Sequence, residues 1–199
     1  VPMKDHHVYI RDAHLYPNGD LLMLITIGGT TPWGIGMAKL NKDSEVLWTY
    51  SGYINNDFEM AQSGNIYVVE HLIREDAPEI IDSVFLPFLE DNIMELTPDG
   101  ELIKRISLID ALNNSPFRAL LKQFVDDGAG DPTHSNSIDE IQYDSQTVPW
   151  LKKGYLAISV RNLNALVIIN PTTGKVVHAM ELHRDIREGE YHHRPGAAV

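Results

Sequence analysis

The sequence predicts an all-β fold, and two repeated patterns carry that prediction. The segments DAHLYPNGDLLML from Asp12 and DFEMAQSGNIYVV from Asp57 each indicate a strand, a tight turn at Gly19 or Gly64, and a second strand. A second hairpin pattern joins two alternating strands by a turn rich in Asn, Pro, Asp or Gly, in KLNKDSEVLWTY, ELTPDGELIKRI and IINPTTGKVVHAM. Two successive hairpins make one four-stranded antiparallel unit.

The four-stranded unit recurs three times, at residues 8–50, 53–108 and about 134–181. The third unit has a degenerate first hairpin, in which SNSIDEIQYD joins GYLAISV through a longer loop. A period of roughly 40 to 50 residues with four short strands is typical of β-propeller blades. Since a closed ring typically needs about four to eight blades, the remaining blades would belong to a longer protein or to another chain. An open β-sandwich with similar hairpins is the alternative.

Two insertions interrupt these units. The stretch REDAPEIIDSVFLPFLED lies between the hairpins of the second unit, acidic at its start and apolar at its end. Residues 107–126 have apolar side chains at helical spacing. We therefore expect a short helical insertion there, made of two helices, with Pro116 at the start of the second.

Composition excludes several classes of function. The chain has 199 residues, of which 43% are hydrophobic, enough for a substantial core. Its net charge of -12 argues against nucleic acid or anionic lipid as a partner. It has no cysteine, which removes disulfides, thiolate metal sites and cysteine nucleophiles. No apolar run approaches the roughly 20 residues of a transmembrane helix, so no transmembrane segment is expected.

Three polar residues of the third unit form the candidate site. The first strand of a blade lines the central channel, and residues two apart on a strand share a face. His134 and Asn136 would therefore project into one cavity, and Arg161, after GYLAISV, would return to the same end of the blade. An imidazole, an amide and a guanidinium make a cradle for a sulfate, phosphate or carboxylate group. The alternative is that these side chains hydrogen-bond loop backbone.

The runs DPTHSNSIDEI and ISVRNLNALVIINPTTGKVV carry a family resemblance, as do the DAHLYPNGDLLML repeats and FLEDNIMELTPDGELIKRISLIDAL. Together they resemble the arylsulfotransferase family of bacterial propellers. The resemblance implies a six-bladed propeller, about three blades of which are present here, and a periplasmic or secreted location. It also implies sulfuryl transfer from an aryl sulfate to a phenol through a histidine intermediate, with no cofactor and no metal.

Residue roles carried over from the resemblance follow the matching motifs. His134, Asn136 and Arg161 would hold the sulfuryl group and offset the charge on the leaving phenolate. Asn162, beside Arg161, would contact substrate. Trp33 is also expected near the ligand, because of its place in the loop TTPWGIG and not because of the resemblance. The histidine that carries the sulfuryl group would be His193 or its neighbour His192, in the tail YHHRPGAAV.

The sequence departs from the family pattern at the first strands of two units. Where the family commonly has His-His-Asp in an early repeat, the chain reads Asn55-Asn56-Asp57 and Ile10-Arg11-Asp12. A channel histidine is therefore missing. This favours the rival hypothesis of a non-catalytic propeller, a binding or scaffold subunit that other protein chains complete or cover.

The remaining motifs have simpler interpretations. The segments NKDSE and TPDGE lack the carboxylate spacing of a calcium loop and are interpreted as hairpin turns. Trp48 and Trp150 are interpreted as packing residues.

Overall fold

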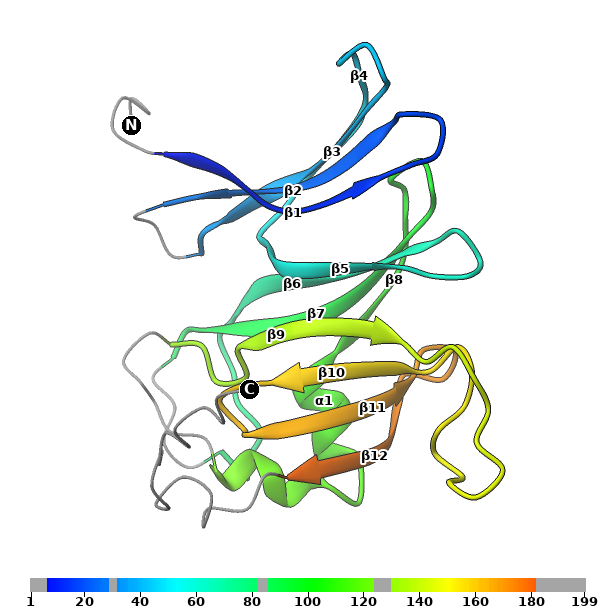
Figure 1. Cartoon of the computed structure of the whole chain (residues 1–199). Coiled ribbons are helices and arrows are strands. Elements are labelled where there is room, and N and C mark those ends of the chain that lie inside the picture. The colour runs from blue at the N-terminus through cyan, green and yellow to red at the C-terminus, as the bar shows by residue number, and fades with distance from the viewer. Residues whose placement is uncertain (1–6, 29–31, 82–85, 124–129, 182–199) are drawn as a thin grey trace, which may run out of the picture.

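A computed structural model gives the fold of the chain and describes residues 7–28, 32–81, 86–123 and 130–181. It contains three four-stranded antiparallel sheets, which confirms the all-β prediction (Figure 1). The first sheet comprises β1 (Val8–Leu15), β2 (Leu21–Ile27), β3 (Gly34–Leu40) and β4 (Val46–Ser51). The second comprises β5 (Ile54–Met60), β6 (Ile66–Arg74), β7 (Phe88–Leu96) and β8 (Leu102–Ser107). The third comprises β9 (Ser135–Glu140), β10 (Leu156–Val160), β11 (Ala165–Asn170) and β12 (Lys175–Glu181).

The three sheets stack face to face, in the manner of consecutive propeller blades, without closing a ring in the described part of the chain (Figure 1). Strands keep their chain order within each sheet, so β1, β5 and β9 are the first strands. An aspartate on β1 links it to β5, and an aspartate on β5 links it to β9. Asp12 Oδ2 accepts a hydrogen bond from the backbone N–H of Phe58 at 3.4 Å, and Asp57 Oδ2 accepts one from Ile138 at 3.1 Å.

The repeated turns have the same conformation in the first two sheets. Gly19 and Gly64 both have φ of 88°, a value that residues with a Cβ rarely adopt. In each turn the glycine N–H donates at 2.9 Å to the carbonyl oxygen three residues earlier, that of Tyr16 or Ala61. The sequence repeat is therefore also a repeat of backbone geometry.

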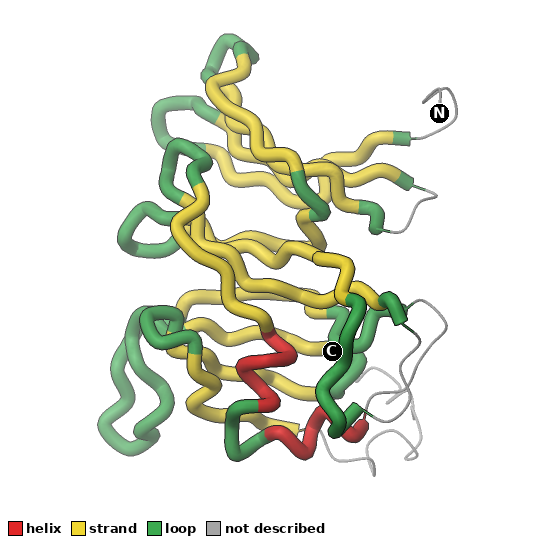
Figure 2. The backbone as a smooth tube through the Cα atoms, turned by 180° about the vertical axis from the view of Figure 1, so that it is seen from behind, coloured by secondary structure: helices red, strands yellow, loops and turns green. Residues whose placement is uncertain are grey.

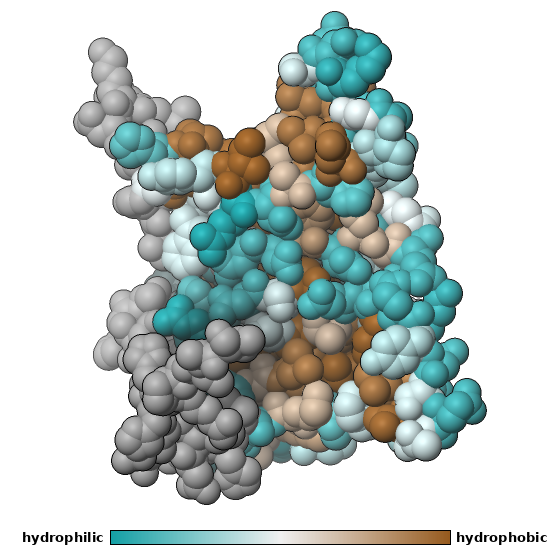
Figure 3. Space-filling model, viewed as in Figure 1, coloured by the Kyte–Doolittle hydropathy of each residue, from teal (hydrophilic) through white to brown (hydrophobic). Residues whose placement is uncertain are grey.

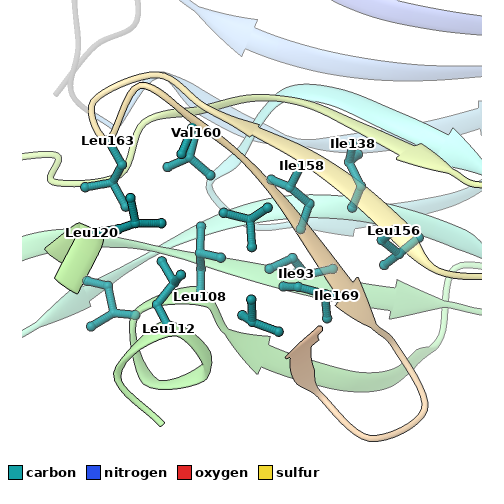
Figure 4. Packing of buried hydrophobic residues seen from close by; sticks show 14 of the residues in the cluster. Ile93, Leu108, Leu112, Leu120, Ile138, Leu156, Ile158, Val160, Leu163 and Ile169 are labelled. Atoms are coloured by element: carbon teal, nitrogen blue, oxygen red, sulfur yellow. The ribbon is translucent and has the colours of Figure 1, made fainter. Parts of the chain in front are cut away.

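Apolar side chains fill both spaces between sheets. Leu22 and Leu24 of the first sheet are fully buried against residues of the second, including Ile54 and Val68. A larger cluster lies between the second and third sheets, where Ile93 meets Ile158 (Figure 4). Alternate burial along β10, with Leu156, Ile158 and Val160 inward, gives the period of two expected for a strand with one covered face.

The helical insertion follows β8 and lies beside the third sheet (Figure 2). Its buried leucine and isoleucine side chains belong to the larger cluster. It consists of α1 (Leu108–Asn113) and the 3-10 helix η1 (Arg118–Gln123). The Ser107 side chain caps α1 by accepting the N–H of Asp110 at 3.0 Å. The second helix begins at Arg118, two residues after Pro116, because the turn at Ser115 intervenes: its hydroxyl accepts the N–H of Phe117. Neither described helix is long and apolar enough to cross a membrane.

The apolar end of the second insertion is the start of a strand. β7 begins at Phe88 and pairs with β6 along its whole length. Every residue of β7 is buried.

Strand β1 of the first sheet is exposed by contrast. The exposed fractions of Val8, Ile10 and Leu15 are 57%, 59% and 70%, and Figure 3 shows apolar side chains at the surface of the first sheet.

Trp48 and Trp150 lie in packing positions. The Trp48 indole N–H donates to the carbonyl oxygen of Pro98 at 3.1 Å, which ties the first sheet to a turn of the second. Trp150 stacks on the His178 ring, with centroids 4.2 Å apart.

Candidate functional site

Loops and strand ends from all three sheets lie along one side of the stack (Figure 1). They are the connection between β2 and β3, the facing parts of β6 and β7, the loop before β9, and the connection between β10 and β11. Their side chains form one cluster, which comprises Trp33, His71, Asp91, Asp131, His134 and Arg161.

His134 is fixed in an uncommon backbone conformation just before β9. Its φ of 49° lies in the left-handed region, which costs a residue with a Cβ on the order of 1 kcal/mol. Asp131 offsets this cost with both carboxylate oxygens: Oδ1 accepts the His134 backbone N–H at 3.0 Å, and Oδ2 lies 2.6 Å from Nδ1 of the ring. The Asp131 side chain is completely buried, so both contacts are shielded from water.

Arg161 contacts His134 through both backbone and side chain. Its backbone N–H donates to the His134 carbonyl oxygen at 3.1 Å, and Nη1 lies 3.1 Å from ring Nε2. Arg161 directly follows β10, which pairs antiparallel with β9, and this pairing returns the chain to His134. The structure thus brings His134 and Arg161 together.

Asn136 lies on β9 with an exposed side chain, next to Arg161 rather than in the His134 cluster. The rule that residues two apart share a face does not extend to His134, because His134 precedes the strand and has a positive φ. Ser135 is buried instead, and Asn136 and Arg161 line a hollow of about 410 Å³ on the third sheet. The hollow also has apolar walls, which include Leu166 and Met180.

Asn162 and Trp33 occupy different parts of the cluster. Asn162 holds the loop before His134: its side-chain amide donates to the Asp131 carbonyl oxygen at 2.6 Å, and its backbone N–H donates to that of Thr133 at 3.0 Å. Trp33 reaches over from the first sheet, and its ring centroid lies 5.7 Å from those of both His71 and His134. A substrate contact by either residue remains a prediction.

The structure adds two residues that sequence reasoning missed, His71 on β6 and Asp91 on β7. Both side chains are buried, and His71 Nε2 lies 2.9 Å from Asp91 Oδ1. Asp91 Oδ2 also accepts the Thr133 hydroxyl at 2.8 Å and the Ser135 backbone N–H at 2.7 Å. One carboxylate of the second sheet therefore holds both neighbours of His134. Ionisable residues inside the apolar runs VVEHLIR and FLEDNIMEL were the available signal, since buried charges need partners.

The His71 and Asp91 pair has shifted pKa values. Burial by itself would lower the pKa of His71, but the contact with Asp91 and the charges of Asp91 and Asp131 raise it overall. Burial would raise the pKa of Asp91, yet the His71 contact and the hydrogen bonds from Ser135 lower it. Both shifts favour the charged forms.

The carboxylates and imidazole of Asp91, Asp131 and His71 have the donor types of a divalent-cation site. One ligand atom from each lies within 4.8 Å of the other two. Most of these atoms already have partners: both Asp131 oxygens contact His134, and Asp91 Oδ2 accepts two hydrogen bonds. The arrangement therefore fits an ion-pair cluster better than a metal centre.

The chain has Arg11 and Asn56 at the positions where the sequence departs from the His-His-Asp pattern, and these two side chains link the first strands of the three sheets. Arg11 Nη2 donates to the Asn56 side-chain oxygen at 3.2 Å, and the Asn56 amide donates to the Ser135 carbonyl oxygen at 2.7 Å. The second imidazole near His134 comes instead from His71, whose Nε2 lies 3.9 Å from Asp131 Oδ2. His192 and His193 lie outside the described residues.

Comparison with known proteins shows the family of the chain. No curated protein matches the chain. Among solved structures, the chain resembles a protein of unknown function from Bacteroides caccae, with 10% identity and a TM-score of 0.33. That match covers 89% of this chain and 62% of the other, so the chain spans less than two thirds of that protein. The family model described as "Arylsulfotransferase (ASST)" matches residues 13–181, a range that includes every strand from β2 to β12 and the whole cluster around His134. The chain therefore belongs to the arylsulfotransferase family.

Proposed function

We propose that this chain forms part of an enzyme that transfers a sulfuryl group from an aryl sulfate to a phenolic acceptor. The observation that carries the proposal is the direct contact between Arg161 and His134, next to the hollow that Asn136 shares with Arg161. Family membership supports the reaction class.

The hollow offers suitable surfaces for both halves of an aryl sulfate. The Arg161 guanidinium can bind sulfuryl oxygens as a planar fork of donors, and the exposed Asn136 amide adds another donor. Leu166 and Met180 provide apolar surface for the ring. Donors aimed at the oxygens also stabilise the charge that develops as the bond between sulfur and the phenolate oxygen breaks.

The proposed route has two steps and one histidine carrier. A histidine nitrogen bonds to sulfur while the phenolate leaves with the electron pair of the sulfur-oxygen bond; an acceptor phenol then bonds to sulfur and releases the histidine. We assign the carrier role to His193 in the carboxyl-terminal segment, with His134, Asn136 and Arg161 around the sulfuryl group. No nucleotide donor, cofactor or metal takes part in this route, and a periplasmic or secreted location accompanies it.

A second candidate function is a non-catalytic propeller that binds or scaffolds other chains. The exposed apolar residues Val8 and Ile10 favour it: they are two apart on β1 and so share a face, and neighbouring exposed apolar side chains often mark an interface. This candidate needs no turnover.

Sulfuryl transfer by the purified native protein decides between the two. A chromogenic aryl sulfate with phenol as acceptor should release coloured phenol, and His134→Ala should abolish that release. His14→Ala is the matched control, because His14 lies outside the His134 cluster. It is near the C-terminal end of β1, where its ring packs against Tyr16. A folded native protein without turnover would overturn the enzyme proposal and leave the binding subunit.

A further inference from the structure

The two ring nitrogens of His134 have chemically different partners. Nδ1 lies 2.6 Å from a carboxylate oxygen of Asp131, and Nε2 lies 3.1 Å from Nη1 of Arg161. A guanidinium has only donors and stays protonated, so Nε2 must be the acceptor in that contact. In a neutral imidazole the proton is then on Nδ1, and Nδ1–H donates to Asp131.

Asp131 is held so that it can maintain this arrangement. Its other oxygen accepts the backbone N–H of His134, and its own carbonyl oxygen accepts the Asn162 amide. Turning the imidazole over would place the Cδ2–H group against the buried Asp131 carboxylate and break the 2.6 Å contact. The carboxylate therefore selects both the orientation of the ring and the position of its proton.

The backbone on either side of His134 is fixed from the neighbouring sheet. Asp91 Oδ2 binds the Thr133 hydroxyl and the Ser135 N–H, so the residues before and after His134 are tied to the same atom of β7. Thr133, Ser135 and Asp91 are all buried. The ring and its backbone are therefore both held so that Nδ1 stays against Asp131 and Nε2 stays against Arg161.

We propose that Asp131 is a positioning residue that holds His134 as the Nδ1–H tautomer, so that the Nε2 lone pair accepts the proton of the acceptor phenol. This inference rests on the proposed function and gives His134 a task different from those of Arg161 and Asn136. As the phenol oxygen bonds to sulfur, its O–H bond breaks and the proton passes to Nε2. The bond from sulfur to the carrier breaks, and its electron pair returns to the carrier. Arg161 releases Nε2 when it turns to the sulfuryl oxygens.

The tautomer can be observed directly in the wild-type protein. Long-range proton-nitrogen correlation spectra of protein labelled with ¹⁵N-histidine distinguish Nδ1–H from Nε2–H imidazole, at a pH where the ring is neutral. Signals absent from the His134→Gln spectrum identify this residue. We expect the Nδ1–H pattern. An Nε2–H pattern in the wild type would overturn the inference, whatever the activity of any variant.

Kinetics of Asp131→Asn test the consequence for catalysis. With phenol as acceptor, kcat should fall on the order of 10²- to 10⁴-fold, as for a catalytic histidine with the wrong tautomer, while KM for the aryl sulfate stays nearly constant. A more acidic nitrophenol needs less help from a base, so the loss should be smaller with it. Asp139→Asn, an exposed aspartate on β9, is the matched control.

The outcomes separate this inference from the proposed function. Equal losses with phenol and nitrophenol would indicate general damage to the site and overturn the base role. Wild-type turnover with an Nε2–H ring would overturn the inference alone. A wild-type protein without turnover would overturn the proposed function together with the base role, while the spectrum would still decide whether Asp131 sets the tautomer.

Discussion

The backbone N–H of Ile138 on β9 donates a hydrogen bond to Oδ2 of Asp57 on β5, across the boundary between the second and third sheets. The acceptor is a partly buried carboxyl group. Burial raises the pKa of Asp57 to about 6, against the lowering effect of the Ile138 hydrogen bond, and the neighbouring carboxyls of Asp12 and Asp139 add to the rise. The contact therefore joins two sheets through a group that titrates in the mildly acidic range.

Asp57→Asn should change the pH dependence of stability. A carboxyl whose folded pKa is raised favours folding while it is protonated, below about pH 4, and that contribution is lost as the pH rises through about 6. Asparagine keeps an acceptor oxygen for Ile138 but cannot ionise. The urea midpoint of the variant should exceed that of the wild type at pH 7, and the gap should close toward pH 4. Asp99→Asn, on an exposed turn, should leave the pH dependence unchanged. A less stable Asp57→Asn protein at pH 7 would contradict the prediction.

Arg161→Lys should impair sulfuryl transfer although the positive charge is kept. Lysine cannot offer two parallel donors to sulfuryl oxygens, and it loses the Nη1 contact with His134. The loss of a charged hydrogen bond of about 1.5 to 3 kcal/mol corresponds to a decrease in kcat/KM of roughly 10- to 100-fold. Steady-state kinetics with an aryl sulfate measure it, with Arg118→Lys on η1 as control. Unchanged kcat/KM would exclude Arg161 from substrate binding.

Asp91→Ala should strongly destabilise the protein. The change leaves His71, the Thr133 hydroxyl and the Ser135 N–H without their buried acceptor. Removal of one member of a buried ion pair costs about 3 to 5 kcal/mol in the free energy of unfolding. Denaturant titration measures the loss. The control is Asp43→Ala, because the ion pair of Asp43 with Lys42 is exposed and such pairs contribute about 0 to 1 kcal/mol. Equal losses in the free energy of unfolding for the two variants would show that the buried contacts of Asp91 do not stabilise the fold.

A chelator should leave the melting temperature of the native protein unchanged. The carboxylate oxygens of Asp91 and Asp131 already have partners within the protein, so the cluster does not need a cation to hold them. Thermal unfolding with and without EDTA tests this expectation, followed by addition of Zn²⁺ or Mn²⁺. A melting temperature that falls with EDTA and recovers with one of these ions would identify a metal site at His71, Asp91 and Asp131.

The repeat and one pair of site residues were predictable because their signals are local. The turns at Gly19 and Gly64 follow from short motifs, and the meeting of Arg161 with His134 follows from one antiparallel pairing. His71 and Asp91 were not predictable in this way. Their approach to His134 depends on how the second sheet docks against the third, and no pattern within a single sheet specifies that register.

Two local predictions differed from the structure for identifiable reasons. The face shared by His134 and Asn136 assumed a strand that starts one residue too early, and hydrogen bonds to Asp131 set the positive φ instead. The second helix was expected at Pro116, where proline is well tolerated, but the Ser115 hydroxyl forms a turn there first. In both cases a short polar side chain redirected the backbone.

The division of the cluster between sheets limits what can be transplanted. His134 and Arg161 belong to the third sheet, while Asp91, which fixes the residues beside His134, belongs to the second. A designer who grafts the third unit alone onto another protein would carry over His134 and Arg161 without the carboxylate that holds the residues beside His134. Any graft of the His134 region would need at least the second sheet docked against the third.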